Sequence, residues 1–218
     1  MLFPVSYYLW WQYAEHRHDV VLLALSMPVV FAYVIPGLGT NWLRLWEFNT
    51  RWRLGRFRPH HGFVFGTATS LFGLLCVDAL PAQPGGLDVV RSAFVLGSVL
   101  AFWNWLYDVY AIKAGFVVVY NRPYHEGAGP EAVATAYAPV FFGTFGACYG
   151  VALALSRHTV DWGSGIWWLI AGGNLAGLVV PVLAFVAYSS LTQGETGLQS
   201  YEGRDEHVRA HATRRIEP

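Results

Sequence analysis

The most regular feature of the chain is a series of long apolar runs separated by short polar segments. A helix needs about 20 apolar residues to cross roughly 30 Å of hydrocarbon. Five runs meet this length, at about 20–38, 62–81, 88–112, 132–155 and 165–188. We therefore predict an all-α, polytopic helical bundle in a membrane, with one transmembrane domain over residues 1–190 and a polar tail over residues 191–218. Residues 113–120 either extend the third helix or form a separate interfacial turn.

The composition agrees with a membrane protein. Hydrophobic residues make up 55% of the chain and charged residues 13%, and the mean hydropathy is +0.36. Because soluble domains carry roughly a quarter charged residues, we expect an integral protein, in the inner membrane of a bacterium. The formal net charge is zero, which gives a role in nucleic-acid binding no electrostatic support.

Basic residues are distributed unevenly over the expected loops. Eleven of the 14 lysines and arginines follow the first run, follow the third run or lie in the tail, and the other three lie on the opposite side. Short loops rich in lysine and arginine stay in the cytoplasm. The sequence thus predicts an N-terminus outside and a C-terminus inside, which agrees with an odd number of spans.

The segment 40–61, between the first two runs, alternates aromatic and basic residues. This pattern is typical of a segment that lies on an anionic leaflet. It predicts a lipid- or partner-binding surface made of Trp42, Arg44, Trp46, Arg51, Trp52, Arg53, Arg56 and Arg58. The same residues also fit a simple cytoplasmic stop signal with an aromatic belt, and the sequence leaves both interpretations open.

Two polar residues lie deep in the third run. Asn104 and Asp108 are four positions apart, so a helix places them on one face. Polar groups at such depth are costly and are usually functional or paired. We take both as candidate catalytic residues, together with His125 and Glu126 in the next polar segment. The alternative is a structural Asp108 that bonds to Asn104 or to a tyrosine or arginine of a neighbouring helix.

Four residues on the expected cytoplasmic side have side chains that bind metals: His60, His61, His125 and Glu126. Their spacing matches no recognised metal motif, and adjacent histidines do not easily bind one ion, so we expect no metal site. None of the eight histidines lies in the middle of a run. This argues against a haem held by two histidines within the bilayer.

Two features predict contacts between helices. Asp78 and Arg91 flank the short connection between the second and third runs, so we expect a structural ion pair. Gly146 and Gly150 lie one turn apart in the fourth run. Small residues at this spacing allow two helices to approach closely.

The sequence carries no phosphate loop, nucleophile motif or other catalytic signature. Aromatic residues make up 17% of the chain, enough to line grooves for flat apolar molecules. We expect a non-catalytic subunit or accessory factor of a larger bioenergetic or pigment-bearing membrane complex, in contact with membrane lipids and other subunits. The bound molecule would be a lipid, quinone, carotenoid or chlorin. The alternative is a small membrane-embedded enzyme or carrier that uses Asp108 and Asn104 on a lipid or isoprenoid substrate.

Overall fold

The computed structural model describes residues 2–77, 81, 83–160 and 165–203 of the 218-residue chain. Within them, the expected all-α membrane bundle is confirmed. Five helical segments are long and apolar enough to span a membrane: α2 (His18–Asn41), α3 (Pro59–Val77), α4 (Gly86–Lys113), the consecutive α6 (Pro130–Thr135) and α7 (Ala138–Ser156), and α8 (Gly165–Gln193). The other elements are α1 (Leu2–Tyr13), β1 (Trp46–Phe48), β2 (Val117–Val119), α5 (Arg122–His125) and the 3-10 helix η1 (Arg157–Val160).

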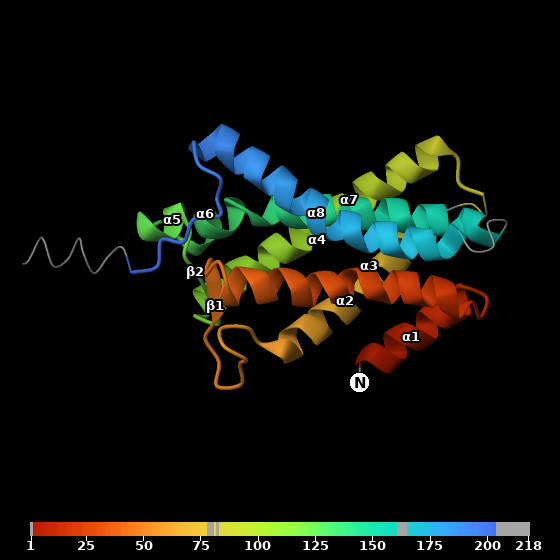
Figure 1. Ribbon diagram of the computed structural model, residues 1–218, viewed down its shortest axis with the longest axis horizontal. Helices are drawn as coiled ribbons and strands as arrows, with labels where there is room; N and C mark the ends of the chain where they lie inside the picture. The colour runs from red at the N-terminus through yellow and green to blue at the C-terminus, as the bar shows by residue number, and fades with distance from the viewer. Residues whose placement is uncertain (1, 78–80, 82, 161–164, 204–218) are drawn as a thin grey trace, which may run out of the picture.

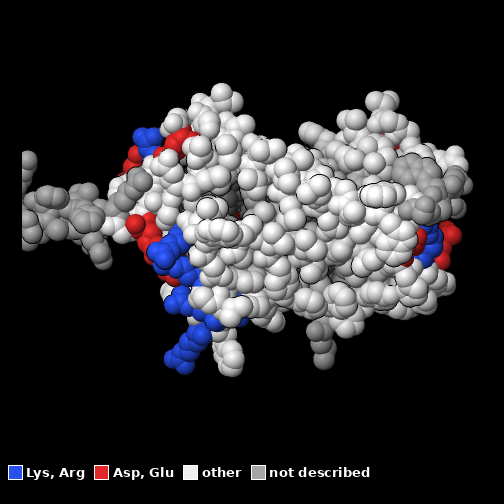
Figure 2. All heavy atoms as spheres, viewed as in Figure 1, with Lys and Arg blue, Asp and Glu red and all other residues white. Residues whose placement is uncertain are grey.

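The spanning helices run roughly along the long axis of the molecule, so their connections gather at two ends (Figure 1). One end carries β1, β2, α5 and α6, and we call it the sheet end. Figure 2 shows charged side chains gathered at both ends of the visible face, with an uncharged band between them. A helical bundle presents such a band to hydrocarbon, because charged groups are costly there.

The core of the bundle lies around α2, which contacts α1, α3, α7 and α8. Phe31 of α2 stacks on Phe145 of α7 with ring centroids 4.0 Å apart. Tyr149 donates a hydrogen bond of 2.6 Å from its hydroxyl to the Ala24 carbonyl. A buried polar contact of this kind joins two apolar helices without leaving a donor unsatisfied.

α4 and α7 pack with their backbones nearly in contact. A Cβ added at Gly150 would lie 2.4 Å from the carbonyl oxygen of Ser92, and one at Gly146 would lie 2.7 Å from that of Leu96. The Ser92 hydroxyl also donates a hydrogen bond of 2.9 Å to the Gly150 carbonyl. The expected close helix approach at these two glycines is confirmed.

α4 ends at Lys113, and Gly115 follows with a φ of +68°, a conformation that glycine adopts without strain. The chain then enters β2, which pairs antiparallel with β1 and places Trp46 opposite Val119. Residues 113–120 therefore do not extend the third helix. They leave it at Gly115 and continue into a strand, which neither sequence alternative included.

A second, smaller core supports this sheet. Phe48 and Phe57 from the segment before α3 pack on Val117 and Val119 of β2 and on Val133 of α6. All five side chains are buried. The polar loops of the sheet end are thus built on an apolar base of their own.

After α8, residues 194–203 turn back across the sheet end (Figure 1). We call this segment the strap. The Ser200 hydroxyl donates a hydrogen bond of 2.6 Å to the Arg44 carbonyl, and the Tyr201 amide donates one of 2.9 Å to the Tyr120 carbonyl. The first part of the polar tail is therefore held against β2 and the segment before β1.

Candidate functional site

A cavity of about 270 Å³ lies where the bundle meets the sheet end. Its walls come from α2, α3, α4, α7, α8 and both strands, and the strap lines one side. The apolar lining side chains are Phe31, Ala32, Ile35, Pro36, Leu38, Leu43, Leu45, Trp46, Phe48, Phe65, Val117, Val119, Ala136, Phe141, Phe142, Val182, Phe185 and Leu198. Such a wall favours an apolar molecule over water, since the molecule gains by leaving water.

Asp108 brings a carboxylate to this wall from the last two turns of α4. Tyr137, between α6 and α7, donates a hydrogen bond of 2.7 Å from its hydroxyl to Asp108 Oδ2. Both side chains are half-buried and line the cavity. Among the residues that the structure describes, none donates to the other carboxylate oxygen, Oδ1. The pair can therefore accept one more hydrogen bond from a bound molecule.

His61 and Tyr107 form a second polar point in the wall. The Tyr107 hydroxyl oxygen lies 3.3 Å from His61 Nδ1, and the two rings stack with centroids 5.6 Å apart. His61 belongs to the first turn of α3 and lies 4.8 Å from the ring of Phe48, centroid to centroid. Tyr107 directly precedes Asp108 on α4, so each polar pair takes one of its two residues from the same turn of that helix.

Asn104 is placed differently from Asp108. It is buried, and its side-chain amide donates a hydrogen bond of 2.8 Å to the Leu100 carbonyl of its own helix. It is not among the residues that line the cavity. Of the two polar residues in the third span, the structure brings only Asp108 to the cavity.

The other two candidate catalytic residues lie on or just after α5 and do not line the cavity. The ring of His125 lies 5.3 Å from that of Tyr201 in the strap. Glu126 is exposed and pairs with Arg122, with 2.7 Å between Oε1 and Nε. These two residues help to fix the strap and α5 in place.

The four candidate metal ligands are not brought together. His60 is exposed on α3, whereas the adjacent His61 lines the cavity. His125 lies against the strap, and Glu126 is paired with Arg122. In the described part of the chain, no group of three or more His, Cys, Asp or Glu side chains could hold a metal ion.

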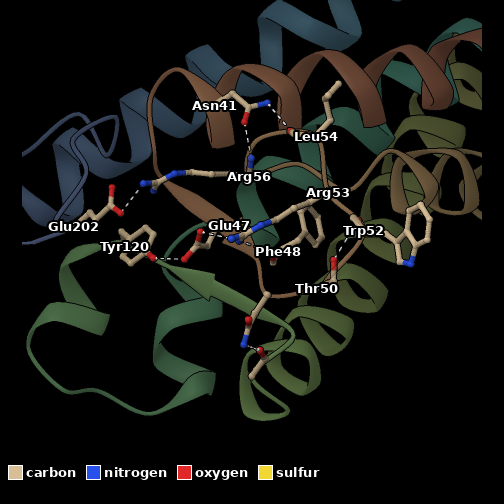
Figure 3. A network of polar contacts seen from close by, with 12 residues as sticks. Asn41, Glu47, Phe48, Thr50, Trp52, Arg53, Leu54, Arg56, Tyr120 and Glu202 are labelled. Atoms are coloured by element: carbon tan, nitrogen blue, oxygen red, sulfur yellow. Dashed lines mark hydrogen bonds and ion pairs between the residues drawn. The ribbon is translucent and has the colours of Figure 1, made fainter.

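A polar network at the sheet end links the strands and the strap (Figure 3), and one of its residues, Tyr120, lines the cavity. The Tyr120 hydroxyl donates a hydrogen bond of 2.7 Å to Glu47 Oε1. Burial and this bond to a carboxylate raise the pKa of Tyr120 above its usual value. Arg56 pairs with Glu202 at 2.8 Å, and this bond raises the pKa of the guanidinium. The strap is thereby tied to the segment before α3.

The eight residues expected to bind lipid or a partner fall into two groups. In the inner group, Trp46 lines the cavity and Arg56 pairs with the strap. The guanidinium of Arg58, also in this group, lies 5.3 Å from the centroid of the Phe116 ring. The outer group is exposed and consists of Trp42, Arg44, Arg51, Trp52 and Arg53.

The expected ion pair between Asp78 and Arg91 falls partly outside the described residues, which do not include Asp78. Arg91 is exposed near the start of α4. It borders a second hollow between α3 and α4, together with Phe72 and Trp103. The ion pair stays a prediction.

Sequence reasoning missed three polar residues that the structure places at contacts. Tyr137 and Tyr107 are two of 12 tyrosines, and nothing in the sequence separates them from the aromatic belts of a membrane protein. Asn174 donates a hydrogen bond of 3.0 Å from its side-chain amide to the Ser26 hydroxyl, which joins α8 to α2. Its position as a polar residue inside the fifth apolar run could have indicated a contact with another helix.

No protein-family model, curated protein or solved structure matches the chain. The candidate site is therefore defined by its own geometry. It is an apolar cavity between the bundle and the sheet end, with a carboxylate–tyrosine pair and a histidine–tyrosine pair in its wall.

Proposed function

We propose that this membrane protein binds one amphipathic, lipid-like molecule of the isoprenoid or quinone class in the cavity below the sheet end. The observation that carries the proposal is the composition of the wall. Aromatic and aliphatic side chains form most of it, and the described polar pairs form one part. Ligand sites for apolar molecules have this make-up, with a few polar groups that fix the orientation.

The size of the cavity indicates which part of the molecule it holds. Small-molecule sites usually measure roughly 300–1,000 Å³, and this one measures about 270 Å³. It therefore takes a head group and the first carbons of a tail, while the rest of the tail lies along the helices in the bilayer.

The polar pairs suit a head group with hydroxyl or carbonyl oxygens. Asp108 Oδ1 accepts a hydrogen bond from a hydroxyl, and the Tyr107–His61 pair offers a donor to a carbonyl. In an enzyme or carrier that acts on the same molecule, Asp108 is the group placed to take up a proton. Asp108→Asn separates the two roles. The apolar wall still retains the molecule, more weakly without the acceptor Oδ1, whereas turnover is lost because the amide cannot take up a proton.

The test is to identify what the purified protein retains. The chain is isolated in mild detergent, and the extracted molecules are identified and counted by mass spectrometry. Ala136→Leu places extra carbon atoms in the cavity wall, whereas Ala171→Leu adds the same atoms on the exposed face of α8. We expect Ala136→Leu to lose most of the retained molecule and Ala171→Leu to keep it. Equal retention by the two variants contradicts the proposal.

We also propose that the protein works as a subunit or accessory factor of a larger membrane complex. The supporting observation is the number of exposed aromatic side chains around α4, among them Phe94, Phe102, Trp103 and Tyr110. Aromatic residues are enriched where proteins associate, although lipid contact also accommodates them. Partner chains in fixed ratio after mild purification support this role, with pigment absorbance if the complex bears pigment. A monodisperse, colourless protein without partners contradicts it.

We further propose that the sheet end faces the cytoplasm of a bacterium, in the inner membrane. The support is the excess of lysines and arginines in the loops of this end and in the tail, where 11 of the 14 occur. With this orientation the strap and the rim of the cavity lie on the cytoplasmic side.

A further inference from the structure

The loop between β1 and α3 leaves the bundle sideways at the sheet end (Figure 1). We call residues 49–55 the finger. A loop that projects across the direction of the spans lies roughly parallel to the plane of a bilayer that these helices cross. We therefore expect the finger to lie at the level of the head groups.

The base of the finger is held in one conformation (Figure 3). The Asn41 side chain accepts a hydrogen bond of 2.7 Å from the Arg56 amide and donates one of 3.4 Å to the Leu54 carbonyl. Leu54 and Phe57 exchange two backbone hydrogen bonds, of 2.7 and 3.2 Å. Gly55 has a φ of +63°, and a Cβ there would lie 2.3 Å from Asn41 Oδ1. The finger is thus preformed, which lowers the entropy lost on binding.

The finger exposes its apolar side chains. Trp52 is 85% exposed and Leu54 is 71% exposed. The Trp52 ring points away from the polar network at the base (Figure 3). Two large apolar side chains at the end of a fixed loop suit the boundary between head groups and acyl chains, where tryptophan is favoured.

The finger is also basic. Arg51 is exposed and forms no ion pair with any residue that the structure describes. Arg53 is exposed too, and its guanidinium reaches Glu47 at 3.3 Å, a contact that water screens. Arg51 and Arg53 flank Trp52 in the sequence, so the positive charges lie next to the exposed tryptophan in the finger.

We propose that the finger binds anionic phospholipid head groups of the leaflet at the sheet end. Trp52 and Leu54 enter the boundary region, and Arg51 and Arg53 meet the phosphates. Charge complementarity selects anionic over zwitterionic lipids. The site depends only on insertion of the bundle into a membrane, and not on what the cavity holds.

The test compares the full chain in nanodiscs of phosphatidylcholine with nanodiscs that also contain phosphatidylglycerol. Hydrogen–deuterium exchange of residues 49–55 reports contact at the finger itself, and native mass spectrometry counts the lipids that stay bound. We expect phosphatidylglycerol to slow exchange at the finger. The preference for this lipid should fall about five-fold for each arginine removed in Arg51→Gln/Arg53→Gln, and Trp52→Ser should weaken the binding of both lipids.

Matched variants at the other end of the bundle control for general effects. Arg91→Gln and Trp168→Ser alter an exposed cation and an exposed tryptophan near the starts of α4 and α8, and they should leave exchange at the finger as in the unmodified chain. Equal exchange in both kinds of nanodisc overturns the proposal, as does an unchanged lipid preference in the double arginine variant. If exchange at the finger slows only when an acidic subunit co-purifies with the chain, whatever the lipid, the finger binds a protein partner and the proposal is overturned.

Discussion

Asp108 and Tyr137 form the polar pair on which the cavity depends most. A carboxylate beside an apolar cavity costs free energy unless hydrogen bonds compensate it, and Tyr137 supplies one at 2.7 Å. The sequence singled out Asp108 because a charged residue is rare in an apolar run. It allowed a tyrosine of a neighbouring helix as a partner but could not say which one. The choice depends on how α7 packs on α4, and 29 positions separate the two residues.

Removing the tyrosine hydroxyl tests this pair. Tyr137→Phe leaves the carboxylate without its described donor, so we expect the free energy of unfolding to fall by about 1–3 kcal/mol. Asp108→Asn keeps an oxygen that accepts the same hydrogen bond, so we expect this variant to lose less free energy of unfolding than Tyr137→Phe. Unfolding in mixed detergent micelles measures both variants.

The control for this prediction is Tyr110→Phe. Tyr110 is on the same helix as Asp108 and is 63% exposed, so loss of its hydroxyl should change the stability little. If Tyr137→Phe lowers the free energy of unfolding no more than Tyr110→Phe does, the hydrogen bond between Tyr137 and Asp108 does not stabilise the fold.

The helices and the remaining elements differed in how well the sequence predicted them. The five spans follow from apolar length, because a bilayer demands both that length and internal backbone hydrogen bonds. The strand β2 was missed, although its three valines favour strands, because an apolar run after a helix also fits a longer helix. The strap was missed because its order comes from contacts with Arg44 and Tyr120, which lie far away in the sequence.

The contact between α4 and α7 gives a prediction at this scale. Gly150→Ala places a methyl group against the Ser92 carbonyl, 2.4 Å away, so the helices must separate. We expect a loss of about 1–3 kcal/mol in the free energy of unfolding. Gly172→Ala is the control, because a Cβ at that position of α8 meets nothing within 4 Å. A loss of the same size in both variants would show that close packing is not the cause.

The strap gives a second prediction for an element. Gly197 has a φ of +71°, and a Cβ there would lie 2.6 Å from the Phe185 ring and 2.7 Å from the Ser189 hydroxyl oxygen. We expect Gly197→Ala to release the strap, so hydrogen exchange over residues 194–203 should become faster. Gly203 has a similar φ of +72° but no atom within 4 Å of a Cβ.

Gly203→Ala therefore separates contact from backbone strain. Both alanines carry the strain of a positive φ, and only the one at position 197 meets other atoms. Unchanged exchange in Gly197→Ala, or an equal change in both variants, contradicts a strap that is held by packing on α8.

At the scale of the whole molecule, charge separates two polar ends from an uncharged middle (Figure 2). The sequence predicted the spans and, by its lysines and arginines, an orientation. The cavity could not be predicted, because its wall combines side chains from Phe31 to Tyr201 that meet only in the folded bundle.

The orientation is tested by reporters fused to the C-terminus. An N-out, C-in arrangement predicts a fluorescent cytoplasmic reporter and an inactive alkaline phosphatase. An active phosphatase at the C-terminus contradicts the arrangement, and it would place the sheet end outside the cytoplasm.

The measurement that tests the central claim most directly locates the bound molecule. A photoreactive isoprenoid quinone analogue is added to the protein in nanodiscs, and the cross-linked residues are mapped by mass spectrometry. Binding in the cavity predicts cross-links to Phe65, Phe141 and Phe142, which line it, and their loss in Ala136→Leu. Cross-links confined to lipid-facing residues such as Leu175 and Leu183, which are 63% and 61% exposed, would contradict the claim.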